Sequence, residues 1–195
     1  MLERLLDIEK DWFLAVNGTH FSWLDPVMLF FSGVWAWSPL VIVLIYFVLK
    51  RRKEFWSMLI CTALTGALNG IVTSLIFKPF FTRFRPTSHP LFMDKVLKVN
   101  GFIANGDFGF ISGHSTNAFA FATLSALVIG DRRYSAVIFI WALLMVYSRV
   151  YLGAHFITDV VPGAMAGALI GWGLYVFYGF LQKRFFNGVN KKITV

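Results

Sequence analysis

Three short polar segments hold most of the residues in this chain that could do chemistry on a phosphate group. They read Lys78-Pro-Phe-Phe-Thr-Arg-Phe-Arg85-Pro86, Ser112-Gly113-His114 and Ser148-Arg149-Val-Tyr-Leu-Gly-Ala-His155-Phe-Ile-Thr-Asp159. Arginine and lysine side chains bind phosphate oxygens, and an imidazole can attack phosphorus or transfer a proton. Each segment borders a long apolar run, where ionisable groups are costly and usually mark function. We therefore interpret the three segments as parts of one phosphate-binding catalytic site.

His155 and Asp159 are the pair most suited to nucleophilic chemistry. They are four residues apart, a spacing that places two side chains on one face of a helix. An Asp that accepts a hydrogen bond from one ring nitrogen leaves the other nitrogen free to attack. A pair at this spacing is often only structural, so the functional interpretation depends on Arg149 beside it and on His114 facing it across the bundle.

Ser112 and Gly113 stand where a glycine-rich loop enters an apolar run, which we expect to be the start of a helix. Free N–H groups at a helix N-terminus bind anions, and glycine lets the backbone approach a phosphate closely. A plain N-cap would explain Ser112 equally well but would leave His114 without a reason. Lys78 and Arg85, taken alone, could be interfacial residues whose charged ends reach toward water.

The composition is that of an integral membrane protein. Of the 195 residues, 57% are hydrophobic and only 14% are charged, whereas soluble domains have about 25% charged residues. The net charge of +8 could indicate nucleic-acid binding, but the basic residues cluster at the ends of apolar runs, which fits membrane topology better. We expect a single domain over residues 1–195 and no nucleic-acid partner. The one cysteine, Cys61, excludes a disulfide framework and a cysteine metal site.

We expect an all-α fold, a polytopic transmembrane helical bundle with about five spans. A span needs about 20 apolar residues, and five segments qualify: 27–49, 55–77, 114–130, 135–153 and 157–181. Pro39 and Pro162 lie inside spans and are expected to kink them. Small residues along the fifth span predict close helix packing within the bundle, with self-association as the alternative. They are Gly163, Ala166, Gly167, Ala168, Gly171 and Gly173.

Two further regions flank these spans. Residues 1–26 are expected to form an amphipathic helix that lies in the membrane interface, because Leu5, Ile8, Trp12, Phe13 and Val16 recur on one side. A soluble-facing cap on the bundle is the alternative interpretation. Residues 78–113 are too polar to span the membrane and too long for a simple connector, so we expect an external active-site loop.

The short basic loops predict the orientation of the bundle. Lys50–Lys53 link the first two spans, Arg132–Arg133 link the third and fourth, and Lys183, Arg184, Lys191 and Lys192 follow the fifth. Basic residues near span ends stay on the cytoplasmic side. The three polar segments therefore share the other face. We predict a multi-pass protein of a bacterial inner (cytoplasmic) membrane whose active site faces the periplasm or cell exterior.

The order and spacing of the three segments resemble the signature of the type 2 phosphatidic acid phosphatase superfamily, shared with vanadium haloperoxidases. That signature is Lys, six residues, Arg-Pro; then Pro-Ser-Gly-His; then Ser-Arg, five residues, His, three residues, Asp. The first and third parts are complete in this chain, and Ile111 replaces the proline of the second. The proline makes no side-chain contact in the chemistry, so this departure bears on loop stiffness and not on activity.

The resemblance implies metal-independent phosphate transfer without a cofactor. His155 would attack phosphorus to form a phosphohistidine, Asp159 would orient its ring, and His114 would protonate the leaving oxygen. Five further residues would hold the phosphate oxygens: Lys78, Arg85, Ser112, Gly113 and Arg149.

The expected substrate is a membrane lipid phosphate or diphosphate at the bilayer surface. Undecaprenyl diphosphate is the leading prediction, with lipid A and phosphatidylglycerophosphate as alternatives. A vanadium haloperoxidase-like enzyme is a remote alternative, because known members are mostly soluble and larger. A non-catalytic transporter or scaffold would leave the complete His–His–Asp set without a role. No motif indicates the lipid head group or the oligomeric state.

Overall fold

The computed structural model describes residues 2–99, 102 and 104–186. Within these ranges the chain is helical, and its one β feature is an isolated antiparallel bridge between Phe84 and Phe108. The α-helices are α1 (Leu2–Asn17), α2 (Asp25–Ser32), α3 (Ser38–Lys50), α4 (Phe55–Asn69), α5 (Lys78–Phe81), α6 (Gly113–Ile129), α7 (Arg132–Tyr151) and α8 (Ile157–Leu181). Short 3-10 helices include η1 (Val34–Trp37), η2 (Arg52–Glu54), η4 (Pro86–Ser88) and η5 (Met93–Lys95), whereas η3 (Gly70–Phe77) and η7 (Gln182–Phe186) are π-helical.

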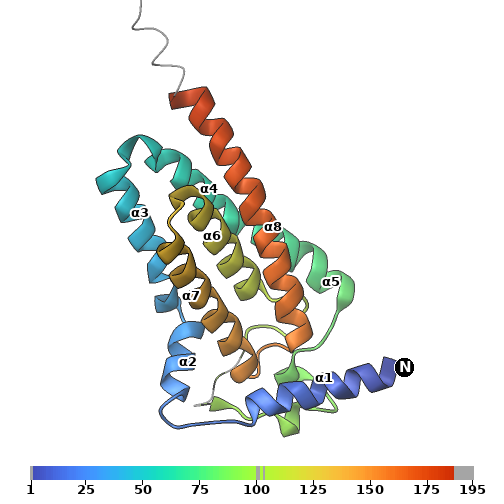
Figure 1. Ribbon diagram of the computed structural model, residues 1–195. Coiled ribbons are helices and arrows are strands. Elements are labelled where there is room, and N and C mark those ends of the chain that lie inside the picture. The colour runs from blue at the N-terminus through green and yellow to red at the C-terminus, as the bar shows by residue number, and fades with distance from the viewer. Residues whose placement is uncertain (1, 100–101, 103, 187–195) are drawn as a thin grey trace, which may run out of the picture.

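Helix α6 forms the centre of the bundle, between α4, α7 and α8 (Figure 1). Most of its residues are buried, because neighbours cover it on nearly every side. Helix α8 packs closely on it through glycines: an added Cβ would lie 2.8 Å from the carbonyl oxygen of Ser112 at Gly163, 2.2 Å from that of Thr116 at Gly167, and 2.4 Å from that of Ala120 at Gly171. The predicted packing role is confirmed at these three glycines, whereas a Cβ at Gly173 would meet nothing within 4 Å.

The spans agree only in part with the five that the hydropathy predicts. Three continuous helical stretches are long and apolar enough to cross a membrane: Arg52–Phe81, Arg132–Tyr151 and Ile157–Phe185. Helix α2 and the stretch Val34–Lys50 would together make a fourth, broken span with a bend of 61°. Helix α6, the remaining predicted span, has 17 residues. A five-span count therefore stays a prediction.

The break in the first predicted span is not where the sequence placed it. The chain bends after α2, at Gly33, whereas Pro39 lies in the first turn of α3. A proline there costs little, because the first N–H groups of a helix have no intrahelical partner. The kink expected at Pro162, which lies inside α8, stays a prediction.

Helix α1 lies across one end of the bundle (Figure 1). Phe13 is fully buried, with its ring centroid 5.7 Å from that of Phe92 and 5.3 Å from that of Phe156. Asn17 at the end of α1 donates to the carbonyl oxygens of Leu97 and Tyr151. The helix ends there and not at residue 26. These contacts fit the bundle-cap interpretation, and the location of α1 in a membrane interface stays a prediction.

The loop predicted over 78–113 begins later than expected, because helical structure continues through Phe81 as α5. Lys78 therefore stands on a helix. Beyond Phe81 the loop folds back over the end of the bundle with the short helices η4 and η5. Residues 100, 101 and 103 of this loop lie outside the described part of the chain.

The basic loops and the polar segments lie at opposite ends of the bundle (Figure 1). Arg51 donates to the carbonyl oxygen of Val128 at 3.0 Å, and the hydroxyl of Tyr178 donates to Glu54. These contacts bring together the α3–α4 turn, the end of α6 and the end of α8. In the predicted topology, successive spans cross in opposite directions and place the basic loops opposite the polar segments. The observed arrangement is consistent with that prediction. Lys191 and Lys192 lie outside the described residues.

Candidate active site

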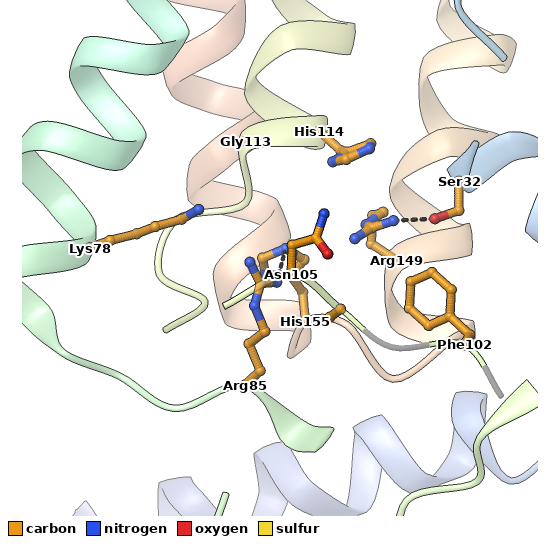
Figure 2. A pocket seen from close by; sticks show the side chains of 10 residues that line it. Ser32, Lys78, Arg85, Phe102, Asn105, Gly113, His114, Arg149 and His155 are labelled. Atoms are coloured by element: carbon orange, nitrogen blue, oxygen red, sulfur yellow. Dashed lines mark hydrogen bonds between the residues drawn. The ribbon is translucent and has the colours of Figure 1, made fainter. Parts of the chain in front are cut away.

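A cavity of about 320 Å³ opens at the end of the bundle that carries the polar segments. Figure 2 shows side chains from several elements turned toward this space. Its lining consists of Ser32, Lys78, Arg85, Phe102, Ala104, Asn105, Gly113, His114, Arg149 and His155. Six of the eight predicted site residues therefore lie on its wall. The other two, Ser112 and Asp159, are fully buried next to wall residues.

The end of α7 brings Arg149 and His155 together. The carbonyl oxygen of Arg149 accepts from the backbone N–H groups of Ala154 (2.9 Å) and His155 (3.1 Å), which folds the chain back across the helix terminus. This turn requires a glycine at position 153: its φ is +75°, and a Cβ there would lie 2.7 Å from the Val96 side chain. The spacing between Arg149 and His155 is thus fixed by a turn.

His155 and Asp159 are close, but not because they share a helix face. Helix α8 begins at Ile157, so His155 precedes the helix and Asp159 occupies its first turn. Asp159 Oδ2 accepts from the backbone N–H of Phe156 at 2.9 Å and lies 3.6 Å from Nδ1 of His155. The predicted proximity is correct, whereas the helical spacing given as its reason is wrong.

The hydrogen-bond partners of His155 indicate which ring nitrogen carries the proton. Nη1 of Arg85 lies 2.8 Å from Nε2 of His155. A guanidinium group can only donate, so Nε2 must be the unprotonated nitrogen. The proton of the neutral ring is then on Nδ1, facing Asp159. This is the tautomer that nucleophilic attack through Nε2 requires.

The surroundings of His155 keep its ring uncharged. Burial lowers the pKa of His155 well below its usual range, and the cations Arg85, Arg149 and Lys78 lower it further. The imidazole is 2% exposed. The ring is therefore neutral at physiological pH, the form that nucleophilic attack would require.

Arg85 comes from an extended segment that pairs with another part of the loop. Phe84 and Phe108 form the β-bridge, and beside it the backbone N–H of Arg85 donates to the carbonyl oxygen of Asp107 at 2.8 Å. Successive residues of an extended segment point to opposite sides. Arg85 and Arg83 therefore point to one side, which faces the His–Asp pair, and Phe84 points to the other.

Backbone carbonyl groups hold the Arg85 guanidinium in place. Its Nε donates to the carbonyl oxygen of Gly106 at 2.8 Å, and Nη1 donates to that of Ala154 at 2.9 Å. Fixed donors of this kind can meet charge that develops on a phosphoryl group without reorganising.

Arg149 is held by a residue of another helix. It is 5% exposed, its Nη1 donates to the hydroxyl of Ser32 at the end of α2, and its guanidinium carbon lies 5.5 Å from the ring centroid of Phe102. The bend after α2 brings Ser32 to this position. Sequence reasoning missed both partners, because a serine in an apolar run and a phenylalanine in a loop carry no local signal of a site.

His114 stands in the first turn of α6, with its ring centroid 6.2 Å from that of Trp37. It lines the cavity across from His155 (Figure 2). One imidazole has the position for nucleophilic attack, and the other has the position for proton transfer to a group bound between them.

Ser112 and Gly113 share the start of α6 but differ in exposure to the cavity. Ser112 Oγ accepts from the backbone N–H of Ser115 at 3.4 Å, so Ser112 is the N-cap of α6. Gly113 reaches the cavity wall, and a Cβ there would meet Thr73 Oγ1 at 3.4 Å, an ordinary contact. Phosphate binding by Ser112 stays a prediction.

Lys78 approaches the cavity from the end of the α4–η3–α5 stretch (Figure 2). The preceding segment, Gly70–Phe77, is π-helical. Such wider turns are frequent at functional sites, since they shift the register of the residues that follow. Among the residues that the structure describes, no group of three His, Cys, Asp or Glu side chains could hold a metal ion.

Arg83 is a polar residue of the site that sequence reasoning missed. Its Nη1 donates to Asp159 Oδ1 at 2.7 Å, on the side of Asp159 away from His155. The only signal in the sequence is its spacing of two from Arg85, which places both arginines on one side of an extended segment. Recognising that signal required knowing that residues 83–85 are extended.

Two imidazoles and three cations surround one cavity of the helical bundle, an arrangement suited to a membrane protein that binds and transfers phosphoryl groups. The chain belongs to the PAP2 superfamily: the model of that family matches residues 54–183. The family resemblance carried by the three motifs is thus confirmed.

Similar proteins share both sequence and fold with this chain. It is 35% identical over 185 residues to a lipid A 4'-phosphatase of Porphyromonas gingivalis, covering 94% of this chain and 78% of that protein. It is 34% identical over 181 residues to a lipid A 4'-phosphatase of Bacteroides thetaiotaomicron, covering 90% and 79%. The crystal structure of a PAP2-type phosphatidylglycerolphosphate phosphatase from Bacillus subtilis superposes with a TM-score of 0.71 at 24% identity, covering 93% and 89%. That match supports the transmembrane PAP2 fold.

Proposed function

We propose that this protein hydrolyses a phosphate monoester of a lipid A-type glycolipid through a phosphohistidine on His155. The observation that carries the chemistry is the 2.8 Å contact from Nη1 of Arg85 to Nε2 of His155, in a cavity that Arg149 and Lys78 also line. Because a guanidinium group only donates, this contact favours an unprotonated Nε2. The lipid A substrate class is supported by the two relatives of about one-third identity. Undecaprenyl diphosphate, the leading sequence-based prediction, has weaker support and becomes the alternative.

The cavity residues suit a two-step transfer. Nε2 of His155 forms a bond to phosphorus while the bond from phosphorus to the lipid oxygen breaks, and His114 gives its proton to that oxygen. Water then attacks the phosphohistidine, His114 takes up a proton from it, and the phosphorus–nitrogen bond breaks to release phosphate. Arg85, Arg149 and Lys78 stabilise the charge on the phosphoryl oxygens in both steps.

We also propose that the cavity opens to the periplasm, near the lipid head groups. The basic residues of the short loops lie at the other end of the bundle, and such residues stay in the cytoplasm. The lipid would enter sideways from the outer leaflet, with its acyl chains remaining in the bilayer.

Phosphate release by the purified protein in detergent tests the proposal. The substrates are bis-phosphorylated lipid A, undecaprenyl diphosphate and phosphatidylglycerophosphate, with mass spectrometry of the lipid product to show which phosphate is lost. We expect the highest kcat/KM for lipid A and no release by a folded His155→Ala variant. A preference for undecaprenyl diphosphate would reverse the substrate assignment, and normal release by His155→Ala would refute the mechanism.

A further inference from the structure

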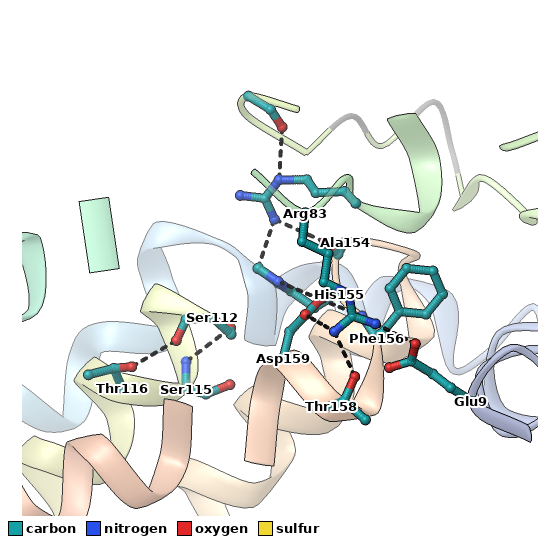
Figure 3. A network of polar contacts seen from close by, with 12 residues as sticks. Glu9, Arg83, Ser112, Ser115, Thr116, Ala154, His155, Phe156, Thr158 and Asp159 are labelled. Carbon is teal, nitrogen blue, oxygen red and sulfur yellow. Dashed lines mark hydrogen bonds and ion pairs between the residues drawn. The ribbon is translucent and has the colours of Figure 1, made fainter. Parts of the chain in front are cut away.

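Arg83 is one of the six unspecified residues between Lys78 and Arg85 of the first superfamily motif, yet it contacts Asp159 on the side away from the cavity. Its Nη1 donates to Asp159 Oδ1 and to Thr158 Oγ1, both at 2.7 Å, and its Nη2 donates to Glu9 (Figure 3). The guanidinium carbon lies 4.9 Å from the ring centroid of Phe156. One planar side chain therefore connects the start of α8 to helix α1.

The two oxygens of Asp159 have separate partners. Oδ2 accepts from the backbone N–H of Phe156 and faces Nδ1 of His155, whereas Oδ1 accepts from Arg83. The carboxylate cannot rotate without losing one of these hydrogen bonds. Its plane, and hence the lone pair that it presents to His155, is fixed from both sides.

Glu9 explains how Arg83 is held in place. Glu9 is 7% exposed although it belongs to α1, a helix at the end of the bundle. A buried carboxylate is costly unless it is paired, and its ion-pair partner in the described part of the chain is Arg83. Phe13 and Asn17 dock the same helix onto the protein, so α1 presents Glu9 at a fixed position.

Arg83 also balances the negative charge of two carboxylates. Arg83 stands between the carboxylates of Glu9 and Asp159, and its side chain is 26% exposed. Without that cation, two carboxylates would face each other near the catalytic histidine. The Asp159 carboxylate would then be free to take a different orientation.

We propose that Arg83, held by Glu9, is a positioning residue that fixes the Asp159 carboxylate against the Nδ1–H of His155. The inference rests on the proposed function, since it gives Arg83 a role only if His155 is the nucleophile. Arg83 itself lies behind Asp159 and is not among the residues lining the cavity. Its loss should therefore slow the chemical step and leave substrate binding nearly unchanged.

Steady-state and single-turnover kinetics of Arg83→Gln test this role. We expect kcat to fall by roughly 10- to 100-fold, the effect of a small misplacement of a catalytic group, with KM little changed. Arg83→Lys should recover part of the loss, because one ammonium can reach Asp159 or Glu9 but cannot bridge them with a planar fork. Glu9→Gln should lower kcat less than Arg83→Gln does.

Two controls separate positioning from general destabilisation. Arg51→Gln removes another Arg–Glu ion pair, with Nη1 of Arg51 3.4 Å from Oε2 of Glu54, at the end of the bundle away from the cavity. It should leave kcat and KM unchanged. In an Asp159→Asn background, Arg83→Gln should add little further loss, because the residue that it positions is already altered.

Several outcomes would overturn the inference. A normal kcat in folded Arg83→Gln would do so, as would a full additional loss in the Asp159→Asn background. A raised KM with normal kcat would make Arg83 a lipid-binding residue instead. If Arg83→Gln does not fold, Arg83→Lys and Glu9→Gln decide the question by the same criteria. Normal turnover by His155→Ala would sink the proposed function itself, whereas an inactive His155→Ala beside a normal Arg83→Gln would sink this inference alone.

Discussion

Replacing Gly167 with alanine tests whether the contact between α6 and α8 holds the catalytic residues in register. The added Cβ would lie 2.2 Å from the carbonyl oxygen of Thr116 and 2.9 Å from its carbonyl carbon. Both neighbours are backbone atoms, so no side chain can turn away to make room. The two helices would have to separate by roughly 1 Å, and overpacking of this kind costs about 1–3 kcal/mol or more.

Gly173→Ala is the matched control on the same helix. A Cβ at position 173 meets nothing within 4 Å, so this change should show only the helix preference of alanine over glycine, about 1 kcal/mol in favour of the variant. Both variants gain this preference, so the difference in stability between them should be the overpacking cost, about 1–3 kcal/mol. For a protein of this size that corresponds to roughly 2–12 °C in Tm.

The same displacement should reach the active site. The backbone N–H of Ser112 at the start of α6 donates to the carbonyl oxygen of Asp159 in α8 at 3.0 Å. Separating the helices stretches this hydrogen bond between the second and third motifs. A shift of about 1 Å at catalytic groups can cost up to about 100-fold in rate, so kcat of Gly167→Ala should fall while Gly173→Ala stays active.

Thermal unfolding in one detergent at one scan rate, with phosphate release measured on the same preparations, decides the matter. A fixed scan rate is needed because unfolding of a membrane protein is commonly irreversible. If Gly167→Ala unfolds at the same temperature as Gly173→Ala and keeps full activity, the close backbone approach of α6 and α8 is wrong.

Four further predictions concern the chemistry and the orientation. Because the pKa of His155 lies well below its usual range, its imidazole should stay neutral as pH falls through 6.5. Arg85→Gln removes one of the cations that lower this pKa, so the acid limb of the kcat/KM–pH profile should move to higher pH. An unmoved limb would show that Arg85 does not set the pKa of His155. Activity should survive EDTA and be inhibited by vanadate, a mimic of the five-coordinate transition state, whereas loss in chelator that magnesium restores would reveal a metal site. His114→Ala should slow the first step more for a lipid monoester than for a diphosphate, whose leaving group needs less protonation; equal losses would make His114 a binding residue. In a Cys61→Ala background, cysteine at Ser88 should react with an impermeant thiol reagent in spheroplasts and cysteine at Ser135 should not; the reverse pattern would place the cavity in the cytoplasm.

The motif residues could be predicted from the sequence because short-range structure brings them to the cavity. Arg149 and His155 meet through one turn at Gly153, and Gly113 and His114 begin one helix. Their order and spacing are therefore visible in the chain itself. The glycines of α8 could be predicted for a similar reason, since small residues four apart line one side of a helix.

The bend in the first span and the supports of the arginines could not be predicted in this way. Nothing near Gly33 distinguishes it from Pro39 as the point where the chain turns, because the choice depends on how α2 packs against α7. Ser32 becomes a partner of Arg149 only through that packing. Such contacts join residues far apart in the sequence, and hydropathy reports only how apolar each segment is.

Glu9 illustrates the same limit on the amphipathic helix. The pattern of α1 predicts an apolar side and a polar side, and Glu9, four residues after Leu5 and four before Phe13, falls on the apolar side, where the pattern gives no partner for its charge. In the structure Glu9 is nearly as buried as Phe13. The reason is a cation supplied by the loop, Arg83, whose other bond reaches Asp159. Helix α1 therefore packs against the protein through apolar contacts and also through the ion pair of Glu9 with Arg83, which in turn donates to Asp159.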